Sequence, residues 1–340
     1  MQSSLARGIV VTLALTLTAC APNPVTGDAL LLGTAIRIQT YRPANAQLID
    51  DAFARVAEIE ATMSTTEADY DTTELLELNR APVASGYTVS ADTQLVIERA
   101  LHFAAISDGA FDPTIWPLVR LWNIGSEQPE VPARQAIDAA QQLVNFRDVR
   151  VGADGLVRFA RQGMGIDVGG IAKGFAADEV VTILREAGVT SALLDFGGNI
   201  YALGRKPDGT AWRIGVQRPD AARSQLLGVL EVQDRSVVTS GPYERFFVEG
   251  GVRYHHLIDP ATGFPAENGI EQVTIVSERS IDADALSTAV YIMGLERGLA
   301  LLQSLPEAEG IIVTLEREVH MTDGIPPLFE LIDTDFTIVP

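Results

Sequence analysis

The spacing of apolar and polar residues along the chain divides it into alternating strands and helices. Alternation of Ile36 and Ile38 with polar neighbours is typical of a strand, whereas apolar residues from Leu48 to Ile59 recur at helical spacing. These patterns predict helices over 45–63, 90–107, 131–143, 172–187 and 282–304. They predict strands over 29–41, 165–168, 191–195 and 200–203, a hairpin over 149–159, and successive strands over 212–276. Because strands and helices do not alternate strictly, we expect an α+β fold with mixed, largely antiparallel sheets and packed helices.

The first 28 residues have the composition of a targeting segment and not of a folded domain. Arg7 precedes an apolar run that is too short to span a bilayer of about 30 Å. We therefore expect a cleavable signal peptide over 1–19. Cys20, the only cysteine, follows Leu17-Thr18-Ala19 and resembles the lipid-attachment site of bacterial lipoproteins, although it would also fit an incidental cysteine in an ordinary signal. Residues 20–28 then form a lipidated tether.

Composition narrows the choice of partners. The 340 residues carry a formal net charge of −20 and are 47% hydrophobic, which is typical of a globular protein. An acidic surface argues against nucleic acid as a partner, and against direct binding to an anionic membrane, so that membrane contact is expected only through the lipid anchor. A phosphate-bearing ligand would need a cation to offset this charge. We expect one folded unit over 29–340, in an extracytoplasmic protein anchored to the inner or the outer membrane.

The most informative chemistry lies between Tyr254 and Gly294. His255 and His256 form an adjacent pair three residues before Asp259. Asp284 and Thr288 are four residues apart on a predicted helix, so their side chains share one face. A carboxylate and a hydroxyl are hard oxygen ligands of the kind that Mg²⁺ prefers. The segment therefore predicts a metal-assisted phosphate site with an acid–base group nearby.

A glycine-rich segment over 165–174 is the second candidate. Its glycines allow a ligand to approach the backbone, and Lys173 adds a cation in the first turn of the following helix. Read alone, the segment is equally consistent with a tight turn into a helix. The segments over 107–114, 194–199 and 239–245 likewise read as ordinary turns when each is taken by itself.

Six segments taken together resemble the ApbE family, the FAD:protein FMN transferases, many of which are bacterial lipoproteins. In chain order they are GAFDPT, IDVGGIAKGFAAD, LLDFGGNIYALG, VVTSGPYER, HHLIDPATGFP and DADALSTAVYIMG. The resemblance covers roughly residues 30–320. It implies a T-fold-related architecture and the Mg²⁺-dependent transfer of FMN from FAD to a threonine hydroxyl of a target flavoprotein, with release of AMP. The implied acceptor is a periplasmic flavoprotein of the kind found in redox complexes.

The resemblance also implies roles for individual residues. Asp284 and Thr288 would be side-chain ligands of Mg²⁺, and Gly170 would offer its main-chain carbonyl to the metal. The implied FAD contacts are Met63, Ala110, Phe111, Asp112, Asp167, Lys173, Ser240 and Ile258.

Two matters stay open at the level of sequence. The general base would be His256 or Asp259, with His256 favoured by its pKa range, although His256 would also suit a purely structural hydrogen bond. The chain departs from the family over 64–79, where a Tyr-Arg pair is missing. Hydrolysis of FAD to FMN and AMP, and FAD binding without catalysis, are therefore alternatives to transfer.

Overall fold

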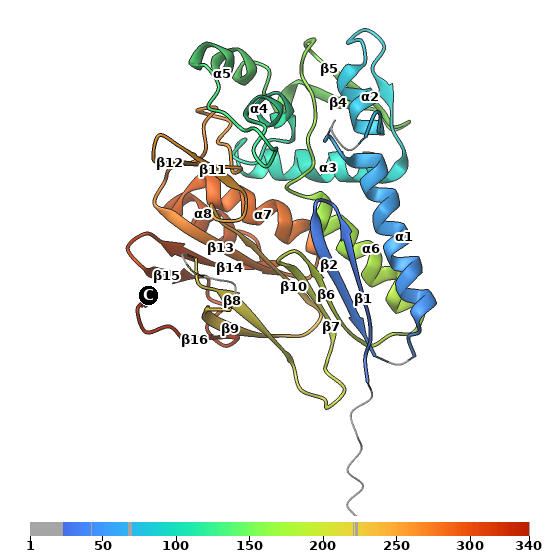
Figure 1. Cartoon of the computed structure of the whole chain (residues 1–340), viewed down its shortest axis with the longest axis vertical. Helices are drawn as coiled ribbons and strands as arrows, with labels where there is room; N and C mark the ends of the chain where they lie inside the picture. Colours follow the sequence, from blue (N-terminus) through green and yellow to red (C-terminus); the bar gives the residue numbers. More distant parts are fainter. Residues whose placement is uncertain (1–22, 42, 67–69, 220, 222–223, 340) are drawn as a thin grey trace, which may run out of the picture.

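The computed structural model describes residues 23–41, 43–66, 70–219, 221 and 224–339. At its centre lies a nine-stranded sheet in the order β1-β2-β6-β7-β10-β13-β14-β15-β17 (Figure 1). All neighbouring strands in it are antiparallel except β15 and β17. The strands are β1 (Val25–Leu31), β2 (Thr34–Thr40), β6 (Ser191–Phe196), β7 (Asn199–Gly204), β10 (Arg235–Ser240), β13 (Ile270–Ser277), β14 (Ala308–Thr314), β15 (Glu318–Met321) and β17 (Thr337–Val339).

Helices cover one face of this sheet. They are α1 (Ala46–Met63), α6 (Ala172–Glu186), α7 (Ser280–Met293) and α8 (Leu295–Gln303). The first of them begins at Asn45, whose side chain accepts a hydrogen bond from the Leu48 amide and so caps the helix. Its apolar face then packs into the main core, to which α6, α7 and the inward side chains of the sheet also contribute.

A second, smaller sheet covers the opposite face. It consists of β8 (Trp212–Gln217), β9 (Leu226–Val232) and β16 (Phe329–Leu331), in the order β16-β9-β8. Trp212 and Leu230 are buried in a separate cluster with Val237 and Ile311 of the central sheet. The central sheet is therefore apolar on both faces, and the molecule has three layers.

The remaining elements gather at one end of these layers, at the top of Figure 1. They are α2 (Glu74–Arg80), α3 (Ala91–Ile106), α4 (Trp116–Trp122), α5 (Arg134–Gln141), two short 3-10 turns (Pro113–Ile115, Phe146–Asp148), and the sheet of β3 (Tyr87–Thr88), β5 (Leu156–Phe159) and β4 (Val149–Val151). A hairpin of β11 (Phe246–Glu249) and β12 (Val252–His255) packs near them. Trp122 anchors a third apolar cluster that joins α4, α5 and this hairpin.

The predicted α+β class is confirmed, together with most of the elements. The helices expected over 45–63, 90–107 and 172–187 are present within one or two residues, and so are the hairpin over 149–159 and the strands over 191–195 and 200–203. The helix expected over 131–143 is shorter, at Arg134–Gln141. Successive strands occupy 212–276, but they are divided among three sheets and do not form one antiparallel sheet.

Three predictions of local structure were wrong. The strand over 29–41 is a hairpin, because Leu32 and Gly33 both adopt positive φ and reverse the chain. The helix over 282–304 is two helices separated at Gly294, which has a φ of 83°. Residues 165–168 form no strand.

The N-terminal targeting segment cannot be compared with the structure in the same way. The signal peptide over 1–19 and Cys20 lie outside the described residues. The tether over 20–28 is described only from Asn23, and its predicted end is too late, because residues 25–28 already pair with β2 as part of β1. In the part that is described, no helix has the length and apolar character needed to cross a membrane.

Close packing of α6 against α7 fixes the part of the fold that carries the candidate chemistry. A Cβ atom added to Gly174 would lie 2.3 Å from the Ser280 carbonyl oxygen and 2.6 Å from the Ile281 Cα. Only glycine allows this approach. The Asp178 carboxylate, one turn further along α6, accepts hydrogen bonds from the amides of Ser280 (2.8 Å) and Ile281 (3.1 Å). It therefore caps the first turn of α7.

We predict that Gly174→Ala lowers the free energy of unfolding by about 1–3 kcal/mol, because the added methyl group must push the two backbones apart. Urea unfolding followed by circular dichroism measures this loss. Glu186→Ala, at an exposed position of the same helix, is the control and should change stability little. Equal stability of Gly174→Ala and the wild type would contradict the packing described above.

Candidate active site

The glycine-rich segment is held as an ordered loop and not as a strand. Asn79 of α2 donates to the Ile166 carbonyl (2.9 Å) and accepts from the Ile166 amide (2.7 Å). The Asp167 amide donates to the Pro113 carbonyl at 2.8 Å. The Asn79 side chain thus pairs with backbone groups that a neighbouring strand would otherwise satisfy. The segment over 165–168 is therefore a loop, although its apolar pattern resembles that of a strand. The loop reaches α6 with its backbone fixed on both sides.

Asp167 connects this loop to the segment that departs from the family pattern. Its carboxylate accepts a hydrogen bond from the Gly169 amide at 2.8 Å and another from the Thr65 hydroxyl. Asp167 remains half-buried, so a ligand could reach it only beside these partners. The altered segment therefore touches the candidate site directly through Thr65.

Gly170 lies beside Thr288 where this loop enters α6. Asp284 and Thr288 lie one turn apart on α7, as their spacing predicted. A Cβ atom added to Gly170 would lie 3.4 Å from Thr288 Oγ1 and 3.1 Å from the ring of Phe111, so Gly170 and Phe111 border the same corner. In the described residues, Thr288 Oγ1 has no hydrogen-bond partner.

Asp284 is a buried carboxylate with two partners from α6. Its Oδ2 accepts from the Gly174 amide at 2.9 Å, and its Oδ1 lies 3.3 Å from Lys173 Nζ. Lys173 Nζ also lies 3.4 Å from the Gly169 carbonyl oxygen. A buried carboxylate is costly unless it is paired, and these contacts with α6 supply the partners that hold Asp284 in place.

This donor set fits Mg²⁺. It offers one carboxylate, one hydroxyl and one main-chain carbonyl, which are all hard oxygens, and Mg²⁺ commonly completes its octahedron with water and phosphate oxygens. Among the residues that the structure describes, no cluster of three or more histidine, cysteine or acidic side chains could hold a metal. A cation at this corner would therefore depend on Asp284, Thr288 and Gly170.

His256 is oriented by the residue that precedes β11. Its ring Nδ1 lies 3.3 Å from the Arg245 carbonyl oxygen, which can only accept, so Nδ1 carries the proton and Nε2 is a free base. Burial lowers the pKa of His256 to about 3, and the positive charges of Arg245 and Lys173 act in the same direction. The imidazole is therefore neutral at physiological pH.

The other two candidates of this segment have structural partners. Buried His255 accepts from the Leu257 amide through Nδ1 (3.3 Å) and lies 3.1 Å from the Ala266 carbonyl through Nε2, as a neutral ring. The Asp259 carboxylate accepts from the Ala261 amide at 2.8 Å and stabilises the following turn. Of the two bases considered, His256 has the better geometry for proton transfer.

Several predicted FAD contacts have side chains engaged within the protein. Burial raises the pKa of Asp112, whose carboxylate accepts from Thr114 and from the Phe146 amide. The Ile258 side chain lies in the cluster around Trp122, so its main chain is the part available to a ligand. Ala110 is half-buried in the turn before Phe111. Ser240 lies 2.8 Å from Ser287 on α7, whose hydroxyl donates to the Asp284 carbonyl.

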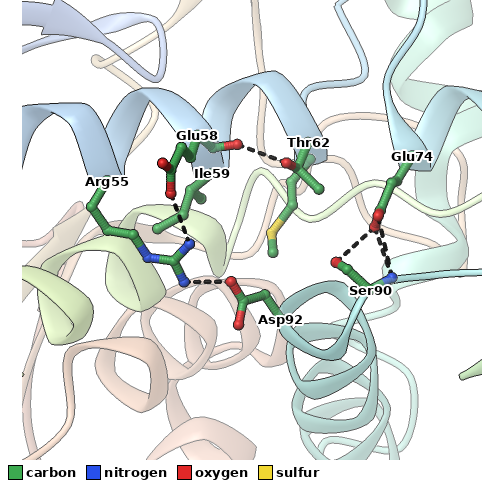
Figure 2. Close-up of a pocket in the computed structure, with 8 residues that line it drawn as sticks. Arg55, Glu58, Ile59, Thr62, Glu74, Ser90 and Asp92 are labelled. Carbon is green, nitrogen blue, oxygen red and sulfur yellow. Dashed lines mark hydrogen bonds and ion pairs between the residues drawn. The ribbon is translucent and has the colours of Figure 1, made fainter.

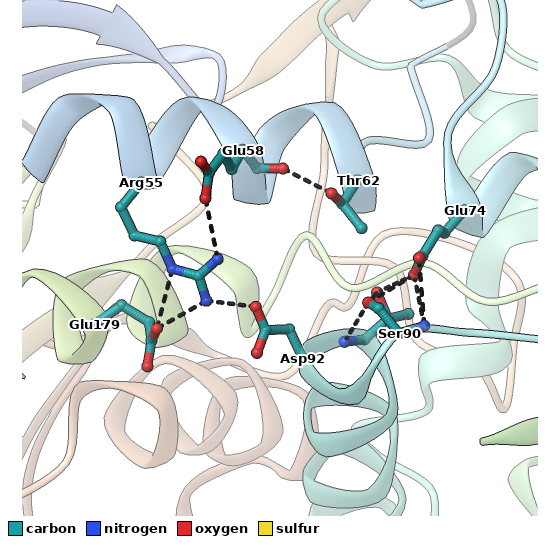
Figure 3. Close-up of polar contacts among 8 residues, drawn as sticks. Arg55, Glu58, Thr62, Glu74, Ser90, Asp92 and Glu179 are labelled. Carbon is teal, nitrogen blue, oxygen red and sulfur yellow. Dashed lines mark hydrogen bonds and ion pairs between the residues drawn. The ribbon is translucent and has the colours of Figure 1, made fainter. Parts of the chain in front are cut away.

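Met63 is buried at the end of α1, where it lines a pocket of about 280 Å³ (Figure 2). The polar groups around this pocket are paired with one another. Arg55 contacts Glu58, Asp92 and Glu179 and so ties α1 to α3 and α6 (Figure 3). Glu74 accepts from the Ser90 amide and hydroxyl and from Thr93. This mutual pairing indicates a structural junction of four helices.

Sequence patterns missed three residues that organise the site. They are Asp178, which caps α7, Arg245, whose carbonyl orients His256, and Thr65, which bonds Asp167. Asp178 is six residues after the start of a predicted helix, where a solvent-facing role is the ordinary expectation for a carboxylate. Burial raises its pKa to about 6, and the two amide bonds offset only part of that effect.

Fold and site together define a class of protein. The site combines a set of oxygen donors, an ion-paired lysine and a neutral histidine. These groups suit metal-assisted chemistry at a phosphate. Residues 32–312 match the ApbE family, so this chain belongs to the ApbE family. It is 38% identical to the FAD:protein FMN transferase of Treponema pallidum, covering 91% of this chain and 90% of that protein. It is 33% identical to a protein of the same name from Klebsiella pneumoniae, covering 92% and 96%.

Solved structures show the same fold. The flavin transferase ApbE of Vibrio cholerae superposes with a TM-score of 0.81 at 27% identity, covering 90% of this chain and 99% of that one. The ApbE protein of Thermotoga maritima superposes with a TM-score of 0.78 at 30% identity, covering 92% and 98%. The resemblance inferred from six short segments is thereby confirmed.

We predict that His255 makes stability depend on pH. Unfolding raises its pKa from about 4 to the ordinary value near 6.5, so the unfolded chain binds the extra proton between these values and stability falls as the pH falls. The loss is about 1.4 kcal/mol per pH unit. The stability advantage of the wild type over His255→Gln, measured by urea unfolding, should therefore shrink by about 2 kcal/mol from pH 6 to 4.5. A constant difference would contradict this prediction.

Proposed function

We propose that this chain transfers FMN from FAD to a threonine hydroxyl of a target flavoprotein and releases AMP, with Mg²⁺ at Asp284, Thr288 and Gly170. The observation that carries the proposal is that Asp284 contacts Lys173 and that Gly170 lies beside Thr288, one turn further along the same helix as Asp284, with Lys173 close enough to His256 for its charge to lower the histidine pKa. Relatives named FAD:protein FMN transferase support the same reaction.

The charges around the corner are suited to a pyrophosphate. Mg²⁺ bound there would neutralise the phosphate oxygens and the negative charge that develops on the departing AMP. Asp284 would then interact with the metal, and Lys173, no longer its only cation, would be free to turn towards a phosphate. In a chain with a net charge of −20, this local positive charge is what makes an anionic substrate acceptable.

His256 is suited to remove the proton of the attacking hydroxyl. The hydroxyl oxygen forms a bond to the phosphorus of the FMN half, the bond from that phosphorus to the AMP oxygen breaks, and His256 Nε2 accepts the proton. A nearby pyrophosphate raises the pKa of the imidazole, because anions favour its protonated form. The low pKa of the free protein therefore keeps the base unprotonated until substrate binds.

The proposal extends to the location of the protein. A signal peptide over 1–19, lipid attachment at Cys20 and a periplasmic site of action rest on the sequence of the first 28 residues. A periplasmic flavoprotein subunit of a redox complex is the acceptor that such a location favours.

Mass spectrometry of a reaction tests the proposal. The purified protein is mixed with FAD, Mg²⁺ and a threonine-bearing flavoprotein acceptor, and we expect the acceptor to gain the mass of one FMN while AMP is released. Both should stop when a chelator is added. Release of FMN and AMP without acceptor modification would favour a pyrophosphatase, and unchanged FAD would favour a flavin-binding protein.

We predict that Asp284→Ala abolishes metal-dependent transfer while the protein still folds, because the variant removes the only carboxylate of the proposed metal site. The measurement is acceptor modification across a range of Mg²⁺ concentrations. Asp282→Asn is the matched control: Asp282 is another buried carboxylate of α7, but it pairs with Arg99 at 2.7 Å. Normal metal-dependent transfer by Asp284→Ala would disprove the assignment.

We predict that His256→Gln lowers kcat by about 10²–10⁴-fold with FAD affinity preserved, as expected for loss of a general base. His320→Gln is the control, since His320 pairs with Glu318 on β15 and does not line the site. FAD affinity comes from fluorescence titration and kcat from acceptor modification. Loss of FAD affinity with kcat retained would instead assign His256 to positioning of the substrate.

A further inference from the structure

The segment that departs from the family pattern holds two consecutive residues of the glycine-rich loop. Near its start, the Thr65 hydroxyl donates to Oδ2 of Asp167. At its end, Asn79 bonds both backbone groups of Ile166, at 2.7 and 2.9 Å. Because the two contacts reach neighbouring residues, a rotation of the loop about one of them is opposed by the other. The position of Asp167 is therefore set by both ends of the segment over 64–79.

Thr65 is itself attached to regular structure. It is the second residue after α1, and the amide of Ser64 donates to the Glu60 carbonyl in the last turn of that helix at 2.9 Å. The Ser64 carbonyl accepts from the Thr73 hydroxyl at 2.7 Å, and Thr73 also caps α2 through the Leu76 amide at 3.1 Å. The helices α1 and α2 thus fix the backbone from which the Thr65 side chain reaches the loop.

The Asp167 carboxylate keeps the capacity to bind a ligand. Among the described residues, its hydrogen-bond partners are the Thr65 hydroxyl on Oδ2 and the Gly169 amide on Oδ1. An ionised carboxylate has about four acceptor positions, so about two of them remain on this half-buried side chain. Asp112, the other acidic residue among the implied FAD contacts, is buried and accepts three hydrogen bonds within the protein. Asp167 is therefore the better placed of the two to contact a substrate.

Two donors, one on each oxygen, fix the plane of the Asp167 carboxylate. The terminal torsion of an aspartate side chain is broad, so a single hydrogen bond leaves the carboxylate free to turn about it. Gly169 belongs to the same loop and moves with it, whereas Thr65 comes from a different element. The direction in which Asp167 presents its remaining acceptor positions is thus tied to α1 through the Thr65 hydroxyl.

The chemistry of a carboxylate limits what Asp167 can bind. It accepts hydrogen bonds and repels other anions, so the phosphate oxygens of a nucleotide are poor partners, whereas hydroxyl and N–H groups suit it. FAD carries such groups on its sugar chains and its ring systems. Lys173, which lies 3.3 Å from Asp284, is the cation of this loop that suits the phosphates. The loop therefore offers different groups to the charged and the uncharged parts of FAD.

We propose that Thr65 is a positioning residue for the substrate: its hydroxyl holds the Asp167 carboxylate in the orientation in which Asp167 accepts a hydrogen bond from a hydroxyl or N–H group of FAD. Thr65 acts through Asp167 and does not itself touch FAD. A threonine that only joined α1 to the loop would leave the affinity for FAD unchanged. This inference rests on the proposed function, because it assigns a residue to the binding of the FAD that the reaction consumes.

Two substitutions of Thr65 test this role. Valine keeps the branched shape of the side chain and removes the hydroxyl, whereas serine keeps the hydroxyl. We expect Thr65→Val to weaken FAD binding about tenfold, as for the loss of one hydrogen bond to a charged group, and Thr65→Ser to stay within about twofold of the wild type. Fluorescence titration with FAD measures both. Thr72→Val is the matched control and should bind FAD normally, because Thr72 lies in the same segment but donates to the Glu77 carboxylate of α2 at 2.7 Å.

A double-mutant cycle tests whether Thr65 acts through Asp167. Asp167→Ala should itself weaken FAD binding, and adding Thr65→Val should cause no further loss, because the partner of the hydroxyl is already absent. A further loss of about tenfold in the double variant would overturn the indirect role, since Thr65 would then contact FAD itself.

The remaining outcomes separate this inference from the proposed function. Normal FAD binding by Thr65→Val would overturn the positioning role and leave transfer untouched. Equal losses in Thr65→Val and Thr65→Ser, together with a loss of cooperative unfolding in urea, would assign Thr65 to stability alone and overturn it as well. Titration needs no acceptor, so a wild type that binds FAD without transferring FMN would contradict the proposed function, while the same variants still decide the role of Thr65. A wild type that does not bind FAD would overturn both.

Discussion

The close contact between α6 and α7 is the constraint on which the candidate site depends. Gly174 lets the two backbones approach, and its amide donates to Asp284 at 2.9 Å. Asp178 holds the first turn of α7 through two amide hydrogen bonds. Because Asp284 and Thr288 follow on the same helix, their positions relative to Lys173 and Gly170 are set by this packing. A small shift between the helices would separate the donors that a metal needs.

Positively charged side chains lie around this site, although the protein as a whole is acidic. Lys173 and Arg245 border it, and Arg253 is exposed on the neighbouring hairpin. Burial and the charges of Arg245 and Lys173 keep His256 neutral, so in the proposed reaction the charges that would attract a phosphate also leave an unprotonated nitrogen close by. In the proposed reaction, one arrangement of charge would thus link anion binding to base catalysis, and binding of the substrate would strengthen the base.

The three layers place function at one end of the central sheet. The core of sheet, helices and small second sheet is apolar and closely packed, whereas the candidate site is made from a loop, two helix turns and the end of a hairpin. Irregular segments can carry such chemistry because rigid elements hold their ends.

Local sequence determined the secondary structure wherever one strong pattern acts within a segment. The amphipathic helix of α1 and the helical spacing of Asp284 and Thr288 needed no tertiary information, and six ordered segments sufficed to identify the family. Tertiary structure decided what depends on residues distant in sequence. Asn79 holds 165–168 as a loop, and the turn at Leu32 divides an apparent strand into a hairpin. Folding alone brings together the partners that give Asp178, Arg245 and Thr65 their roles. The periodicity of the local sequence therefore contains no sign of these roles.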